Sequence, residues 1–158
     1  MEEGYNVVWL PSYGPEMRGG TANCSVVISD KLIASPVVPT PGAAVVMNNP
    51  SLEKFGATVR PGGVVIINTS LVNLECTRTD IRQVPVAAND VAIELGSGKA
   101  ANMVVLGAYV GATGAVSIEN LKAFMQKKFA HKPQFVDLNM EALQAGYDRA
   151  RAAMQEEK

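Results

Sequence analysis

The strongest constraint on the fold is a set of short apolar runs in which polar residues do not alternate. Three of them cover residues 5–10, 43–47 and 64–68. A strand with one face in water alternates between apolar and polar residues, whereas a parallel strand between two helical layers is apolar on both faces. We therefore expect the three runs to be strands buried on both faces.

Two further strands are predicted. Residues 21–29 follow a glycine-rich loop so closely that an antiparallel pairing with residues 5–10 is open, beside a place in the main sheet. Residues 83–87 contain Pro85, which has no N–H to give to a neighbouring strand and favours a sheet edge or a bulge.

Helices are expected between the strands, over residues 50–55, 89–95, 100–113, 117–129 and 139–155. Asn49 is the expected N-cap of the first, with Pro50 at its first helical position. Residues 100–113 are apolar nearly all round, which predicts a buried helix, and Gly107 and Gly111 would let another element pack closely. The fold class is α/β: one domain over residues 1–158, a Rossmann-like three-layer sandwich with a mostly parallel sheet.

Composition excludes several classes of function. The 158 residues are 47% hydrophobic and 18% charged, with a net charge of −1. A chain with no basic stripe is a poor partner for nucleic acid or an anionic membrane. We found no basic-then-apolar signal pattern, and the longest apolar stretch, residues 103–112, is short of the roughly 20 residues that cross a bilayer. We expect a cytoplasmic protein.

No catalytic or metal site can be assembled. Cys24 and Cys76 are distant in sequence, and iron–sulfur and zinc sites need about four ligands. His131 is the only histidine and is expected on the surface between two helices. The stretch 96–99 fails as a phosphate loop, since Ile93 and Ala100 stand where such a loop needs Gly and Ser or Thr. Asp80, Asp90 and Glu94 are expected to be solvated.

The candidate binding residues lie mainly in loops that follow strands. The carboxyl ends of parallel strands meet at one sheet edge, where ligands bind. One such loop covers residues 12–20, and Asn48-Asn49 and Thr69-Ser70 follow other strands. Within the first loop we single out Tyr13, Gly14, Pro15, Glu16, Arg18, Gly19 and Gly20. Arg18 has two open roles, a salt bridge with Glu16 that staples the loop or an anchor for a phosphate or carboxylate.

Asn102 is the remaining candidate. Its place one turn into an apolar helix predicts that its amide needs partners, because an unpaired buried amide costs about 1–3 kcal/mol. A tie to a neighbouring loop is the interpretation we favour, and a contact with a ligand or another subunit is the alternative.

Several motifs together resemble one family, the gamma subunit of the 2-oxoacid:ferredoxin oxidoreductases. They run from near Gly4 almost to the C-terminus, and no one of them would be specific alone. The motifs are Tyr13-Gly14-Pro15-Glu16-Met17-Arg18-Gly19-Gly20, Asn48-Asn49-Pro50, Pro61-Gly62-Gly63, the run 101–108 and Ala145-Gly146-Tyr147.

The resemblance implies a multi-subunit enzyme that oxidatively decarboxylates a 2-oxoacid to an acyl-CoA and reduces ferredoxin. Alpha and beta subunits, with or without a delta subunit, would be its partners. They would hold thiamine diphosphate, Mg²⁺ and the iron–sulfur clusters, and this chain would be structural and help to shape the approach of coenzyme A. Pyruvate, 2-oxoglutarate and branched-chain 2-oxoacids are all open as substrates, and the isolated chain is expected to be inactive.

One departure from the family bears on nucleotide binding. Family members usually begin with a strand and a glycine-rich turn of the Gly-x-Gly-Gly-x-Gly kind, which this sequence lacks. We therefore expect the native product to be longer at its N-terminus. Two other functions stay open: a free-standing nucleotide- or acyl-binding α/β module, and a homo-oligomeric scaffold.

Overall fold

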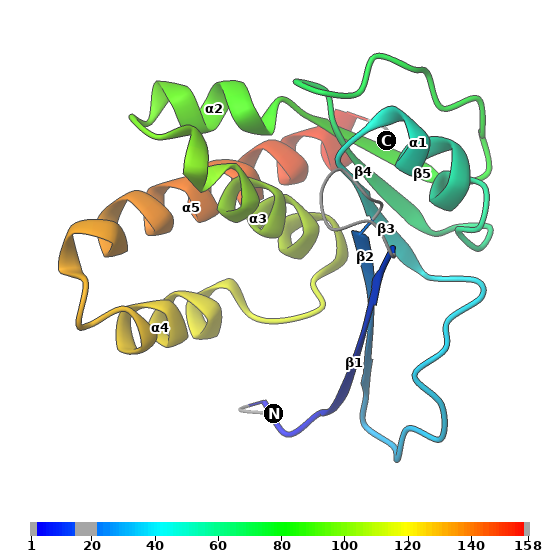
Figure 1. Ribbon diagram of the computed structural model, residues 1–158, viewed down its shortest axis with the longest axis horizontal. Coiled ribbons are helices and arrows are strands. Elements are labelled where there is room, and N and C mark those ends of the chain that lie inside the picture. The colour runs from blue at the N-terminus through cyan, green and yellow to red at the C-terminus, as the bar shows by residue number, and fades with distance from the viewer. Residues whose placement is uncertain (1–2, 15–21, 157–158) are drawn as a thin grey trace. The chain divides into compact units, whose positions relative to one another are not determined.

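The computed structural model describes residues 3–14 and 22–156 (Figure 1). The chain divides into two compact units, residues 1–40 and 41–158. The division falls at the end of the proline-rich segment 35–41. That residues 1–158 form one domain stays a prediction.

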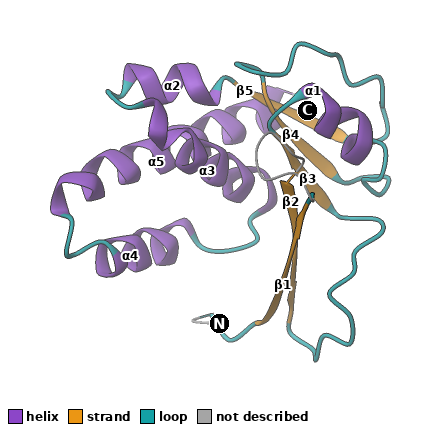
Figure 2. Cartoon of the chain, viewed as in Figure 1, coloured by secondary structure: helices purple, strands orange, loops and turns teal. Residues whose placement is uncertain are grey.

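The first unit contains a two-stranded antiparallel sheet, coloured as strands in Figure 2. It consists of β1 (Asn6–Tyr13) and β2 (Ala22–Ser29), with Asn6 opposite Ser29 at one end and Tyr13 opposite Ala22 at the other. No residue of either strand is buried. The antiparallel alternative is confirmed for these residues, and the prediction of a strand buried on both faces at residues 5–10 is wrong. The apolar run at residues 5–10 pairs with β2, and β2 carries polar side chains on one of its faces.

The second unit is built on a three-stranded parallel sheet. Its strands are β3 (Ala43–Val46), β4 (Val64–Asn68) and β5 (Arg82–Val86), in the order β3-β4-β5. All five residues of the central strand β4 are buried. Pro85 is exposed on the edge strand β5, as its missing N–H predicts. The parallel sheet predicted from residues 43–47 and 64–68 is confirmed.

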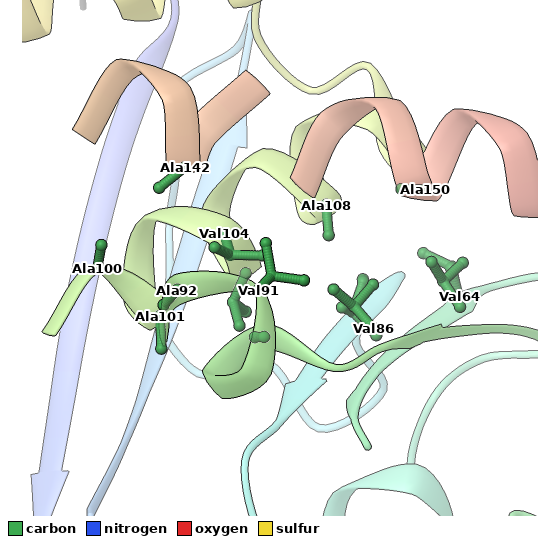
Figure 3. Packing of buried hydrophobic residues seen from close by; sticks show 14 residues of the cluster. Val64, Val86, Val91, Ala92, Ala100, Ala101, Val104, Ala108, Ala142 and Ala150 are labelled. Atoms are coloured by element: carbon green, nitrogen blue, oxygen red, sulfur yellow. The ribbon is translucent and has the colours of Figure 1, made fainter. Parts of the chain in front are cut away.

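Two apolar cores lie on opposite faces of this sheet, because successive β4 side chains point to opposite sides. Val64 and Ile66 join a core formed with α2 (Ala88–Glu94), α3 (Ala101–Thr113) and α5 (Pro133–Glu156), part of which Figure 3 shows. Val65 and Ile67 pack instead with Leu52, Val59, Val72 and Ile81. The result is the expected three-layer α/β arrangement, with the thicker helical layer on the α3 side.

The helices differ from expectation mainly at their ends. α1 (Asn49–Ser51) continues as a π-helical turn, η1 (Leu52–Gly56), and its N-cap is Asn48 rather than Asn49. A short 3₁₀ turn, η2 (Gly98–Ala100), leads into α3. α4 (Ile118–Lys128) is capped by Ser117, as predicted. α5 begins at Pro133 rather than 139, since proline is well suited to the first turn of a helix.

The helices α3 and α5 cross at backbone contact. A Cβ atom at Gly146 would lie 1.8 Å from the carbonyl oxygen of Val104, and one at Gly107 would lie 1.9 Å from that of Leu143. At Gly111 it would be 2.6 Å from the carbonyl oxygen of Tyr147. The close packing predicted for Gly107 and Gly111 is confirmed, and Gly146 is its counterpart on α5.

Candidate binding site

Polar residues gather at the carboxyl edge of the three-stranded sheet, the edge where ligands bind in open α/β folds. An asparagine lies at or shortly beyond the end of each strand: Asn48 after β3, Asn68 as the last residue of β4, and Asn89 shortly after β5. Since the three strands are parallel, these ends lie on the same edge. We call this group, with Asn49, Ser70 and Asp90, the asparagine edge.

Asn68 lies at the centre of the asparagine edge and is 1% exposed. Its Oδ1 accepts a hydrogen bond from the backbone N–H of Ala88 at 3.1 Å. Its Nδ2 donates to Oδ1 of Asn89 at 2.8 Å and lies 3.9 Å from the sulfur of Met47. A buried amide is stable only when it is paired, and here it ties the end of β4 to the start of α2.

Two neighbouring pairs of hydrogen bonds fix the loops around Asn68. The Ser70 hydroxyl donates to Oδ2 of Asp90 at 3.0 Å and accepts from the Asp90 backbone N–H at 3.2 Å. The side chain of Asn49 holds Asn73: its Oδ1 accepts from the Asn73 N–H at 3.0 Å, and its Nδ2 donates to Asn73 Oδ1 at 2.6 Å. Asp90 was expected to be solvated without a partner, but its carboxylate accepts a hydrogen bond from Ser70.

Asn48 is the predicted site residue at this edge. It is exposed, and its Oδ1 accepts from the Ser51 N–H at 2.9 Å as the cap of α1. Asn49 and Ser70 were expected in loops at this edge, whereas Asn68 and Asn89 were not predicted as parts of the site. The signal that could have found Asn68 is its position as the polar last residue of an apolar strand, directly at a carboxyl end.

The glycine-rich loop after β1 is described only at its start. Tyr13 ends β1 and is 73% exposed, and Gly14 is half-buried. The predicted residues Pro15, Glu16, Arg18, Gly19 and Gly20 lie outside the described residues. β1 belongs to a separate antiparallel sheet, so the prediction that this loop and Asn48 follow strands of one parallel sheet is wrong.

Asn102 differs from the prediction that its amide is buried, because its side chain is exposed at the start of α3. Water can satisfy an exposed amide, so no protein partner is required. The structure also separates Asn102 from the asparagine edge: α2 runs from that edge for seven residues, about 10 Å, before the turn into α3 (Figure 1).

An ion pair lies at the other end of the sheet, before β5. The Arg78 guanidinium contacts Asp80 through two bonds, of 2.9 and 2.5 Å, and donates to the carbonyl oxygen of Val59 at 2.6 Å. The hydrogen bond from Arg78 lowers the pKa of Asp80, which corrects the expectation that Asp80 has no partner. At the start of α4, hydrogen bonds from its own backbone N–H and from Ser117 lower the pKa of Glu119.

The amides and the hydroxyl of the asparagine edge are hydrogen-bonded to one another and to the backbone, so they hold the ends of the strands together. Within the described part of the chain, no group of three or more His, Cys, Asp and Glu is placed to hold a metal ion. His131 is exposed in the turn between α4 and α5, as predicted. Among the described helices, none combines the length and apolar character needed to cross a membrane.

The chain is similar to known proteins in both sequence and fold. The family model described as pyruvate ferredoxin/flavodoxin oxidoreductase matches residues 1–149. The ketoisovalerate oxidoreductase subunit VorA of Methanothermobacter marburgensis is 39% identical over 157 residues, which cover 98% of this chain and 32% of VorA. The 2-oxoglutarate synthase subunit KorC of the same organism is 31% identical, covering 91% of this chain and 80% of KorC.

A solved structure shares the fold over nearly the whole chain. It is the gamma subunit of a keto/oxoacid ferredoxin oxidoreductase from Geobacter sulfurreducens, with a TM-score of 0.78 and 31% identity. The match covers 96% of this chain and 83% of that subunit. The chain thus spans about a third of the VorA relative and most of the two shorter relatives.

Proposed function

Because the chain belongs to the pyruvate ferredoxin/flavodoxin oxidoreductase family, we propose that it serves as the gamma subunit of a multi-subunit 2-oxoacid:ferredoxin oxidoreductase. Such an enzyme oxidatively decarboxylates a 2-oxoacid to an acyl-CoA and passes the electrons to ferredoxin. The observation that carries the proposal is the match of nearly the full chain to a gamma subunit of this type, in both sequence and fold. We place the complex in the cytoplasm.

In this proposal the redox and decarboxylation chemistry belongs to the other subunits. Thiamine diphosphate with Mg²⁺ needs oxygen ligands, and an iron–sulfur cluster needs about four cysteines. Cys24 and Cys76 are free and lie in different compact units, and the described residues form no metal-ligand cluster. These residues do not fit either group, so the alpha and beta subunits, with a delta subunit where present, would carry them.

The chain's own contribution would be to shape the approach of coenzyme A. The residues proposed to contact coenzyme A or another subunit are Tyr13, Gly14, Pro15, Glu16, Arg18, Gly19, Gly20, Asn48 and Asn102. Arg18 is the natural anchor among them, because a guanidinium binds a phosphate through two parallel hydrogen bonds. Asn48 is exposed beside the other amides of the asparagine edge, and Tyr13 is exposed at the end of β1.

The 2-oxoacid itself would be selected by a subunit other than this one. The named relatives are a subunit of a ketoisovalerate oxidoreductase and a subunit of a 2-oxoglutarate synthase, and each matches most of this chain. A chain of one fold that serves different 2-oxoacids is better suited to assembly and to the shared acyl acceptor than to substrate choice.

Purification of the complex from the source organism tests the proposal. We expect the chain to co-elute with larger polypeptides, and the fraction to contain thiamine diphosphate and iron and to reduce a viologen dye in the presence of a 2-oxoacid and coenzyme A. The isolated chain should show no visible iron–sulfur absorbance. A chain that elutes alone, from cells with full 2-oxoacid oxidoreductase activity in other fractions, would refute the proposal.

A further inference from the structure

Three lysines gather where α4 turns into α5. Lys127 and Lys128 end α4, Lys132 lies in the turn that follows, and all three are exposed. The backbone N–H of Lys132 donates to the carbonyl oxygen of Phe129 at 2.8 Å, so the turn is tight and keeps Lys132 near the end of α4. Figure 1 shows this turn at the end of the second unit that lies away from the three-stranded sheet.

Two exposed phenylalanines accompany these lysines. Phe124 on α4 is 38% exposed, and the Lys128 ammonium lies 5.4 Å from the centroid of its ring. Phe135 is 48% exposed in the first turn of α5, where its N–H donates to the carbonyl oxygen of Lys132 at 3.0 Å. We call Phe124, Lys127, Lys128, Lys132 and Phe135 the basic aromatic patch.

The positive charge of this patch is not neutralised within the described part of the chain. The sequence between Glu119 and Asp137 contains no acidic residue, and no described carboxylate forms a salt bridge with a lysine of the patch. The three lysines carry +3 in a chain of net charge −1, so the rest of the chain carries −4. The patch is therefore a positive region on an otherwise acidic chain.

The structure of α4 accounts for only part of the patch. The helix dipole favours cations in the last turn of a helix, which explains Lys127 and Lys128. It does not explain Lys132, which lies beyond the helix, or the exposure of two aromatic rings. Protein interfaces are enriched in aromatic residues at their centre and have a polar rim. The patch has this composition, which indicates a binding surface.

The charge distribution favours a small acidic protein over a long polyanion. Proteins that bind nucleic acid tightly make about 6–10 phosphate contacts, and the patch offers three lysines on a chain that is otherwise acidic. A small protein can contact the patch without approaching the acidic remainder. Encounters between electron carriers and their enzymes suit such a surface, because they bury less than about 1,200 Å² in total.

We propose that the basic aromatic patch captures the electron carrier of the complex, an acidic ferredoxin, whose carboxylates would surround an apolar spot on its surface. The inference rests on the proposed function, which supplies ferredoxin as the acceptor. The chain itself takes no part in the electron transfer. Opposite charges attract over about 8–10 Å at ordinary salt, so the patch raises the rate at which the carrier reaches the complex.

Steady-state kinetics of the assembled complex test the capture role. Lys127→Gln, Lys128→Gln and Lys132→Gln are combined in this chain, and 2-oxoacid and coenzyme A are saturating. With ferredoxin of the source organism as acceptor, kcat/KM should fall about tenfold at low salt, since steering contributes roughly 10–10³ to such rates. The difference should nearly vanish at high salt, where the Debye length approaches about 3 Å. Reduction of methyl viologen, a small cation, should be unchanged.

A charge-matched control separates the patch from the net charge of the chain. Lys31→Gln, Lys54→Gln and Lys99→Gln remove three lysines that are exposed elsewhere. Lys54 matches Lys128 closely, because its ammonium lies 5.3 Å from the centroid of the Phe55 ring. The control should lower kcat/KM for ferredoxin less than about twofold. We expect both variants to keep the wild-type far-UV circular dichroism and to co-elute with the other subunits.

The outcomes distinguish this inference from the proposed function. A wild-type complex that reduces neither viologen nor ferredoxin refutes the proposed function. Full viologen reduction with unchanged kcat/KM for ferredoxin in the patch variant refutes the capture site alone, as does an equal loss in the control. Failed assembly of the patch variant also overturns it, because another subunit then covers the patch. Weaker retention on heparin or on phosphatidylserine vesicles, with unchanged ferredoxin kinetics, would assign the patch to nucleic acid or membrane instead.

Discussion

Replacing Gly146 by alanine perturbs the closest contact between α3 and α5. The new Cβ would lie 1.8 Å from the Val104 carbonyl oxygen and 3.0 Å from the Ala108 nitrogen, both backbone atoms of a helix. To restore an ordinary contact of about 3.4 Å, α5 must move away by roughly 1.5 Å. The interface that would open contains Val104, Leu143 and Ala150, each 0% exposed.

The magnitude follows from two opposing terms. In an open helical site Gly→Ala stabilises by about 1 kcal/mol through helix propensity. Overpacking costs about 1–3 kcal/mol when side chains can yield, and more when only backbone can move. We therefore expect Gly146→Ala to lower the free energy of unfolding by about 3 kcal/mol or more, a large part of the roughly 5–15 kcal/mol that holds a domain.

Urea unfolding followed by far-UV circular dichroism measures the effect on the helices. Gly111→Ala, where the nearest atom is the Tyr147 carbonyl oxygen at 2.6 Å, should be less destabilising than Gly146→Ala. Gly98→Ala is the control, since its nearest contact is a side-chain atom of Ile93 at 3.5 Å, and it should change stability by less than about 0.5 kcal/mol. A Gly146→Ala variant as stable as the wild type would refute the backbone contact.

Three further predictions concern the polar residues. Asn68→Ala leaves the buried Ala88 N–H without its acceptor and should lower stability by about 1–3 kcal/mol in the same urea assay; a loss no larger than that of the exposed Asn102→Ala would contradict this. Asp80 has a lowered pKa when folded, so its contribution is present above the unfolded pKa of about 3.9 and is lost as the pH falls through the folded value. The difference in unfolding midpoint between Asp80→Asn and wild type should therefore shrink as the pH is lowered below about 3.9, and a constant difference would exclude the ion pair as its cause. In the assembled complex, Arg18→Ala should raise the KM for coenzyme A or weaken assembly, and unchanged kinetics and assembly would leave the loop-stapling salt bridge with Glu16 as its role.

The main sheet could be predicted because a strand that is buried on both faces is apolar without alternation. Residues 43–47 and 64–68 are apolar without alternation, and the structure makes them parallel strands. Residues 5–10 show the same apolar pattern but lie in an exposed hairpin. The difference comes from the partner strand: its register with β1 sets which face is polar, and a single run does not contain that information.

The site was predictable in its location and less so in its residues. Asn48 lies at the carboxyl edge as expected, yet the buried amide that organises this edge is Asn68. Asn102 was a candidate site residue because it interrupts an apolar helix, but in the structure it is exposed. Whether an asparagine in an apolar run is buried depends on which side of its element faces the core, and tertiary packing decides that.

The motifs that carry the family resemblance contain two kinds of residue: glycines that are needed for packing and residues that are proposed for binding. Gly107 and Gly146 permit the crossing of α3 and α5, and a Cβ at Gly63 would lie 2.7 Å from the Gly42 carbonyl oxygen. These glycines are required for packing whatever the chain binds. The binding hypothesis therefore depends on the other motif residues, chiefly Arg18 and Asn48. Substitutions at Gly146 and Gly107 test the fold, and only substitutions at Arg18 and Asn48, with stability unchanged, test the coenzyme A contact.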